Sequence, residues 1–256
     1  MKGTHFGKDE GTHSQMSGKD EATHGKEKVF NESNVGGVIF FLNNLPIRFH
    51  PQVDDDLFLV PQIDDHSEVD DDVDGVVPSL PVGPENIGAT FFLPLKRILS
   101  SKLNLHGFIR AIYVNFGPMG YYKVKPNTRL INQLAAFQTQ LSVLFQYKII
   151  SNPDNREEVW WTLTNLPDIV SNLPANCRKI GCMDGEGYHS QGSIVNYRDY
   201  ISAASDEQTY VFVVGEIDTE IQAHIDDFVK VSDYDLVATE SLNRVISTME
   251  IKWGIF

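Results

Sequence analysis

Apolar residues in this chain gather into short runs that polar segments separate, and most runs have the length of a buried strand. Residues 37–42 and 210–214 are continuous β-branched and aromatic runs; Asn43 and Asn44 close the first and Gly215 closes the second. Such runs are typical of strands that are buried on both faces of a parallel sheet. We therefore predict a central strand over residues 210–214, with Gly215 at its carboxyl end, where α/β sheets bind ligands.

The other runs follow either the helical or the strand period. Helical spacing predicts helices over residues 91–105, interrupted by Pro94, and over residues 235–253. A third helix is expected over residues 128–145, with Asn127 and Thr128 as its cap. Strands are expected at residues 108–116 and 121–125, and further strand or helix-edge pieces are expected at residues 158–163 and 178–182. Strands that alternate with helices predict an α/β fold with a largely parallel sheet.

Two segments lack apolar periodicity. Residues 1–34 hold an imperfect polar repeat with very few apolar side chains, and we expect a disordered tail there. Residues 51–86 are rich in Asp and Pro and contain no calcium-binding loop of the EF-hand pattern. We expect this segment to be an irregular acidic insertion in a single domain over residues 35–256.

The formal net charge of −14 at pH 7 is concentrated in the acidic insertion. Residues 49–95 carry eleven acidic and no basic side chains, whereas residues 96–256 carry eighteen acidic and fifteen basic ones. A folded body with a net charge near −3 has no basic stripe of the kind that neutralises phosphates. The charge distribution therefore counts against tight nucleic-acid binding by a monomer and favours protein partners.

Neither a membrane span nor a signal peptide is predicted. No apolar run approaches about eighteen residues, and the chain does not begin with a charged and then apolar segment. Cys177 and Cys182 fit a reducing compartment. Together with His189 they have irregular spacing, so we interpret them as buried free thiols and predict no metal site.

Ordered motifs in the second half of the chain resemble those of one enzyme family. The chain reads V-K-P-N-T-R-L-I-N-Q-L-A-A-F at residues 124–137, L-P-A-N-C-R-K-I at 173–180, V-F-V-V-G-E at 211–216, S-D-Y-D-L-V-A at 232–238 and W-G-I at 253–255. Together these motifs resemble the SPOUT-class methyltransferases that modify N1 of a pseudouridine in small-subunit ribosomal RNA. The resemblance weakens before Gly107.

The resemblance implies a SPOUT-type fold with a C-terminal trefoil knot, a homodimer, and S-adenosylmethionine held against three loops. The first loop maps to Cys182. The second begins at Gly215 and has Glu220 where the family has a glycine. The third loop maps to Val231, Ser232, Asp233, Tyr234, Asp235 and Leu236.

The resemblance also implies where RNA would bind. Three arginines in the family motif R-I-P-R-T-F-x-R-F correspond here to Arg129, Asn132 and Ala136, so two are lost. An Arg-Pro-Asp segment that supplies a catalytic carboxylate in the family is not intact, and Glu85 is its nearest substitute. Fewer phosphate contacts imply weaker, less salt-dependent RNA binding.

Four functions are consistent with these observations. The first hypothesis is a diverged homologue of the ribosomal RNA pseudouridine N1-methyltransferases, acting in small-subunit biogenesis with weak or lost activity. The alternatives are a non-enzymatic ribosome-assembly or protein-binding module on the same dimer, an enzyme with an altered substrate, and an idle duplicate. The resemblance further implies a nuclear or nucleolar location, with ribosomal RNA or pre-ribosomal proteins as partners.

Overall fold

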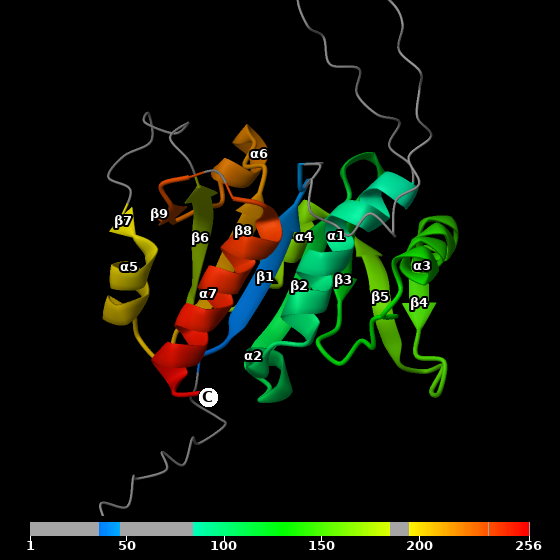
Figure 1. Ribbon diagram of the computed structural model, residues 1–256, viewed down its shortest axis with the longest axis horizontal. Coiled ribbons are helices and arrows are strands. Elements are labelled where there is room, and N and C mark those ends of the chain that lie inside the picture. Colours follow the sequence, from blue (N-terminus) through cyan, green and yellow to red (C-terminus); the bar gives the residue numbers. More distant parts are fainter. Residues whose placement is uncertain (1–35, 47–83, 185–194, 235, 256) are drawn as a thin grey trace, which may run out of the picture. The chain divides into compact units, whose positions relative to one another are not determined.

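A mixed sheet of nine strands runs through the part of the chain that the structure describes (Figure 1). The structure is a computed structural model, and it describes residues 36–46, 84–184, 195–234 and 236–255, which belong to one unit over residues 33–256. The predicted tail and the acidic segment up to residue 83 lie outside the described residues, as do His189 and Asp235.

The sheet combines a parallel part with an antiparallel extension. Its strands are β1 Val38–Asn43, β2 Ile109–Asn115, β3 Tyr121–Val124, β4 Ile149–Ser151, β5 Val159–Thr164, β6 Cys177–Asp184, β7 Val195–Asn196, β8 Thr209–Gly215 and β9 Asp227–Ser232. They are ordered β4-β5-β3-β2-β1-β8-β6-β9-β7. All neighbours from β2 to β7 are parallel, whereas β3, β5 and β4 are added in antiparallel pairs. The predicted α/β fold with a largely parallel sheet is confirmed.

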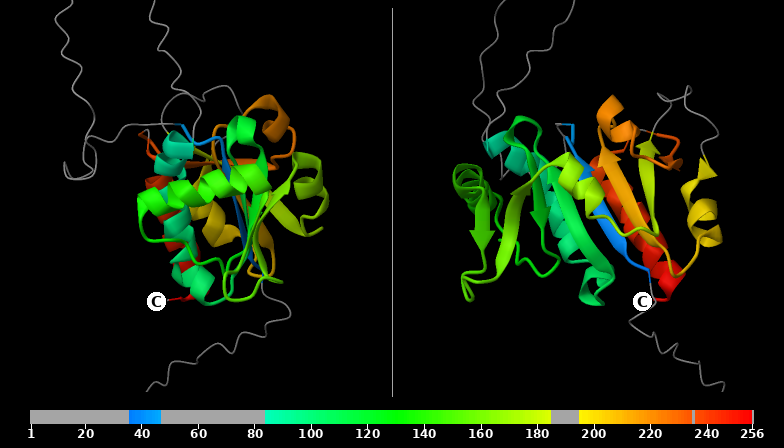
Figure 2. Two further views of the ribbon diagram at one scale, coloured as in Figure 1. Left: turned by 90° about the vertical axis from the view of Figure 1, so that its right-hand side faces the viewer. Right: turned by 180° about the vertical axis from the view of Figure 1, so that it is seen from behind.

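Helices cover both faces of the sheet (Figures 1 and 2). They are α1 Pro84–Leu99, α2 Lys102–Leu105, α3 Leu134–Tyr147, α4 Leu166–Ser171, α5 Tyr197–Ala203, α6 Thr219–Gln222 and α7 Ala238–Trp253, with a 3-10 turn η1 at Gly117–Met119. Helices α1 and α7 pack side by side on one face, and the short α4 and α6 lie on the other. No helix of the described ranges is long and apolar enough to cross a membrane.

Strand β8 lies between β1 and β6 and is buried on both faces, as its apolar run predicts. Tyr210, Phe212 and Val214 belong to the larger core beneath α1 and α7. Val211 and Val213 belong to the smaller core with α4 and α6. Because both faces are covered, the strand has no solvent-facing positions and therefore no polar alternation.

The first predicted helix has different bounds. Helix α1 begins at Pro84, so the expected irregular insertion up to residue 86 is wrong at its last three residues. Proline suits the first turn, where its missing N–H costs nothing, and the helix continues through the buried Pro94. It ends at Leu99 because Ser101 starts a separate turn: its Oγ donates to the Ile98 carbonyl (2.7 Å) and accepts from the Asn104 amide (3.2 Å).

The third predicted helix begins later than expected. Asn127 and Thr128 do not cap it, because the chain from Lys125 to Thr128 is tied to β5 instead. The Lys125 amide donates to the Trp160 carbonyl (2.9 Å), and the buried Thr128 donates its amide to Lys125 (3.0 Å). Helix α3 therefore starts at Leu134, and Arg129 and Asn132 lie in the loop before it.

Candidate functional site

The parallel strands β1, β8, β6 and β9 end at one common edge of the sheet (Figure 1). From β1 the chain continues to β2 on one side, whereas from β8 it continues to β9 on the other. Connections that leave neighbouring strands in opposite directions create the crevice in which α/β proteins bind ligands. The predicted site residues Gly215, Val231 and Ser232 all lie at this edge.

Position 215 requires a glycine, because the backbone there lies very close to the end of β1. Its φ is +115°, and a Cβ atom added to it would lie 2.1 Å from the carbonyl oxygen of Asn43. The next amide, of Glu216, donates to the same oxygen at 2.9 Å. The glycine thus lets the loop after β8 turn directly over the end of β1.

Two buried asparagines connect the ends of three strands. Asn43 is 0% exposed; its Nδ2 donates to the carbonyl of Glu216 (2.5 Å), and its Oδ1 accepts from Nδ2 of Asn115 (2.8 Å). The Oδ1 of Asn115 accepts in turn from the amide of Gly117 (2.9 Å). This network was not predicted, because the apolar run before Asn43 indicates only that a strand ends there. The available signal was an asparagine as the last residue of two buried strands.

Two acidic side chains in the loop after β8, those of Glu216 and Asp218, have hydrogen-bond partners outside β6 and β9. Glu216 accepts a hydrogen bond from Nδ2 of Asn44, and Asp218 caps α6 by accepting from the Ile221 amide (2.8 Å). The charges of Glu220 and Asp218 add to burial in raising the pKa of Tyr121, which lies on β3. Glu220, predicted from the resemblance to contact the cofactor, is the second residue of the short helix α6.

The predicted third loop is shorter than expected, because Val231 and Ser232 are the buried last residues of β9. Arg244 of α7 donates to the Val231 carbonyl (3.1 Å), and the Tyr234 amide donates to Oγ of Ser232 (3.1 Å). The ion pair with Lys230 lowers the pKa of Asp233. Tyr234 is 78% exposed and Leu236 is half-buried.

The first predicted loop is described only at its beginning. Cys182 is buried on β6 and packs with the larger core. Cys177, at the start of the same strand, is half-buried, and burial raises the pKa of its thiol. No cluster of three or more potential metal ligands occurs among the described residues.

The predicted RNA-binding residues lie at the other end of the sheet, around α3. The Arg129 side chain is 83% exposed and forms an ion pair with Asp154 at 3.7 Å. Asn132 is exposed in the same loop, and Ala136 is half-buried in the first turn of α3. Helix α1, whose second residue is Glu85, packs against α3, with Phe92 and Phe137 in ring contact.

Two other features have structural roles. Asp227 accepts hydrogen bonds from Arg178 and Tyr200 where β6, β9 and α5 meet. Burial and the contact with Asp227 raise the pKa of Tyr200 to about 12, whereas the hydrogen bond from Arg178 lowers the pKa of Asp227.

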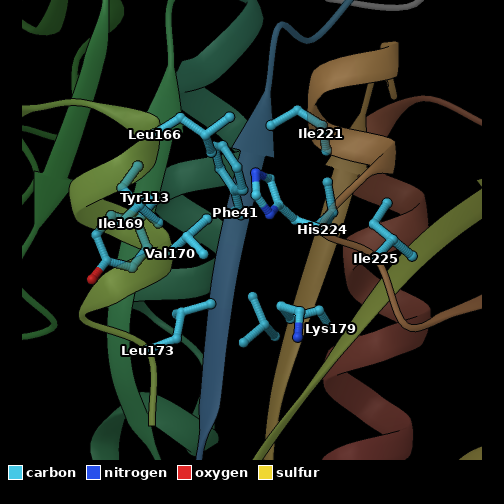
Figure 3. A pocket seen from close by; sticks show the side chains of 12 residues that line it. Phe41, Tyr113, Leu166, Ile169, Val170, Leu173, Lys179, Ile221, His224 and Ile225 are labelled. Atoms are coloured by element: carbon cyan, nitrogen blue, oxygen red, sulfur yellow. The ribbon is translucent and has the colours of Figure 1, made fainter. Parts of the chain in front are cut away.

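An apolar pocket between α4 and α6 contains Phe41, Leu166 and Ile221 in its lining (Figure 3). None of the predicted site residues lines it, so it belongs to the smaller core.

Comparisons with known proteins identify the family of this chain. Residues 91–250 match the family described as EMG1/NEP1 methyltransferase. The chain is 24% identical over 167 residues to the ribosomal RNA small subunit methyltransferase NEP1 of Candida albicans, and the match covers 63% of this chain and 59% of that protein. The chain thus matches about three fifths of the length of this curated relative.

The fold is that of a solved relative. The crystal structure of Archaeoglobus fulgidus Nep1 bound to S-adenosylhomocysteine superimposes with a TM-score of 0.51 at 16% identity, covering 86% of this chain and 99% of that one. Because the family match extends over more than half of the sequence and the fold agrees with it, this chain belongs to the EMG1/NEP1 methyltransferase family.

Proposed function

We propose that this chain is a diverged family member that binds S-adenosylmethionine and has weak or lost methyl-transfer activity toward N1 of a pseudouridine in small-subunit ribosomal RNA. The observation that carries the proposal is the common edge at which β8, β6 and β9 end, with Gly215 and Val231 held in place. A solved relative with this fold binds S-adenosylhomocysteine, and a curated relative is named as a ribosomal RNA methyltransferase.

The residues at this edge fit the cofactor. Acidic side chains after β8 add bulk and negative charge near the site. Two of these carboxylates already have partners, because Glu216 is bound to Asn44 and Asp218 caps α6. The backbone at Gly215 and along residues 232–236 would hold the cofactor, which supplies a methyl group on a positively charged sulfur. The task of these residues is to keep the methyl group in line with the attacking nitrogen, which is where most of the rate arises.

We propose weak or lost activity because the RNA contacts are depleted. Of the three positions that correspond to the family's arginines, only Arg129 carries a charge, and it already forms an ion pair with Asp154. Asn132 offers a neutral amide and Ala136 offers no polar group. Each lost phosphate contact reduces the salt-dependent part of RNA affinity. The nucleoside would then be held less often at reacting distance.

The proton on the pseudouridine nitrogen also needs an acceptor, which contributes about 10²–10⁴-fold to the rate. Asp218 is committed to capping α6 through its contact with the Ile221 amide. Glu85, in the first turn of α1, is the carboxylate that we propose for this role. A glutamate in place of the family's aspartate, without the neighbouring arginine, is a further reason for slow transfer.

We also propose the homodimer and the trefoil knot that the family resemblance implies. Helices α1, α2 and α7 each expose a large apolar side chain: Leu93 is 50%, Leu105 75% and Ile251 67% exposed. A second copy would cover apolar groups of this size. Multi-angle light scattering of the purified protein tests the dimer, and an experimental structure that includes residues 185–194 tests the knot.

The alternative is a non-enzymatic ribosome-assembly or protein-binding module on the same dimer. The net charge near −3 over residues 96–256 favours it, since a near-neutral body attracts protein surfaces more readily than RNA. Both roles belong to small-subunit biogenesis, so we propose a nuclear, nucleolar location with pre-ribosomal proteins or ribosomal RNA as partners. Fluorescence microscopy of the tagged protein tests that location.

A transfer assay separates the two roles. Labelled S-adenosylmethionine is incubated with an RNA hairpin that contains one pseudouridine, in parallel with a family member in which all three arginines are present. We expect transfer at least ~100-fold slower, because two phosphate contacts are lost and the proton acceptor is a substituted carboxylate. Transfer at the intact rate would contradict weak or lost activity. Cofactor binding with no transfer at all would favour the non-enzymatic role.

A further inference from the structure

We propose that Asn43, supported by Asn115, is a positioning residue that holds the loop after β8 in the shape that binds S-adenosylmethionine. This inference rests on the proposed function, because it assigns a role within the same site. Neither asparagine belongs to the motifs that carry the family resemblance. The inference comes instead from the hydrogen bonds at the ends of three neighbouring strands.

Asn43 fixes both polar backbone groups of a single loop residue. Its main-chain carbonyl accepts from the amide of Glu216 (2.9 Å), and its side-chain Nδ2 donates to the carbonyl of Glu216 (2.5 Å). One residue of β1 thus determines the orientation of the peptide groups on both sides of residue 216. Gly215, with its φ of +115°, makes this approach possible.

Asn115 determines which way the Asn43 amide points. Its Nδ2 donates to Oδ1 of Asn43 (2.8 Å), which leaves Nδ2 of Asn43 to donate toward Glu216. Asn115 is itself held by the amide of Gly117, in the turn after β2 (2.9 Å). The direction of each amide in this chain of bonds is therefore defined by its neighbour.

The core alone does not explain an asparagine at this position. The other five residues of β1 are apolar and buried, and an aliphatic side chain would continue that pattern. A buried amide is unfavourable unless it is hydrogen-bonded, so its benefit lies in what it binds. Here it binds Glu216, the residue after Gly215 in the loop that maps to the cofactor site. Losing it should release residues 215–218 before it unfolds the sheet.

The test compares Asn43→Ala with Ser101→Ala, a matched control. Ser101 is also a buried polar residue with two hydrogen bonds, but it caps α2 at the opposite end of α1 from the site (Figure 1). S-adenosylhomocysteine affinity, amide hydrogen exchange at residues 214–218 and thermal stability are measured in the full chain. Asn43→Ala should weaken affinity about 10-fold, as expected for one lost buried hydrogen bond, and should speed exchange at Glu216. Ser101→Ala should lower thermal stability and leave affinity and exchange unchanged.

A second variant, Asn115→Ala, keeps the proposal testable if Asn43→Ala does not fold. Asn115→Ala leaves both contacts between Asn43 and Glu216 possible but removes the bond that orients the amide, so a smaller loss of about 3-fold is expected. The inference is overturned if neither asparagine variant exceeds Ser101→Ala in lost affinity and in exchange at Glu216. If the unchanged protein does not bind S-adenosylhomocysteine, the proposed function fails; unchanged exchange at Glu216 in Asn43→Ala would separately refute the positioning role.

Discussion

Arg244 on α7 donates a hydrogen bond from Nη1 to the carbonyl oxygen of Val231, 3.1 Å away, and so ties the closing helix to the end of β9. The loop after β9 is therefore anchored from a helix, much as the loop after β8 is anchored from β1. Anchored loops lose less conformational entropy when a ligand binds. The two loops are accordingly shaped by the fold before any cofactor arrives.

Arg244→Met should weaken binding of S-adenosylhomocysteine about 3- to 10-fold, because one hydrogen bond to a strand-end carbonyl is lost while the aliphatic stem is kept. Isothermal titration calorimetry measures the change. Lys252→Met is the control: Lys252 lies on the same helix and donates to the Ala204 carbonyl (2.7 Å), which does not belong to β9. Equal loss of affinity in both variants would show a general effect of destabilising α7.

Gly215→Ala should destabilise the protein by about 3 kcal/mol or more, since a Cβ atom would collide with the Asn43 carbonyl at a positive φ. Gly254→Ala is the control, because Gly254 also has a positive φ (+66°) but nothing lies within 4 Å of its added Cβ. It should cost only about 1 kcal/mol. Urea unfolding measures both; equal costs would contradict the close approach of β8 to β1.

Asp227→Asn should lower stability at neutral pH by about 1 kcal/mol, a modest value because Arg178 is nearly half exposed and water screens the pair. Arg178 lowers the pKa of Asp227 in the folded state. Its contribution is therefore complete above the unfolded pKa, about 4, and is lost as pH falls through the lower folded value. The difference between wild type and variant should thus disappear in acid. A difference that stays constant down to pH 2 would be inconsistent with this pair.

Asn132→Arg combined with Ala136→Arg should partly restore RNA binding and steepen its salt dependence, by something under two units of log affinity against log salt. Electrophoretic or fluorescence binding assays at several salt concentrations provide the slope. Ser202→Arg with Ala203→Arg adds the same charge on α5, at the opposite end of the sheet from α3. If both double variants gain affinity equally, the effect is one of net charge and not of the loop before α3.

The sequence allowed the central strands and the neighbouring β2, β3 and β5 to be predicted, but not β9 or the short helix α6. Residues 37–42 and 210–214 are apolar throughout because helices cover both faces of β1 and β8. Strand β9 was missed, since Asp227 and Lys230 make it read as a loop although Arg178 and Asp233 pair with them. Helix α6 has a single turn and depends on the Asp218 cap.

The candidate site was predicted only in outline. Gly215 was predicted as a candidate from its position at the end of an apolar run, and the structure places it at the end of β8. The bond between Asn43 and Asn115 joins residues 72 positions apart, and it depends on β1 and β2 being neighbours. The contact between Arg244 and Val231 likewise depends on how α7 returns across β9. Tertiary pairing of this kind leaves no periodic signal in a single sequence.

The central claim is that the fold keeps a cofactor site while its RNA contacts are depleted. Calorimetric titration of S-adenosylhomocysteine into the purified full chain tests it most directly. We predict saturable binding with one ligand per chain, an affinity that falls in Asn43→Ala and Arg244→Met, and no change in Asn132→Arg with Ala136→Arg. A folded protein that gives no binding heat and no thermal stabilisation at millimolar ligand would contradict the claim.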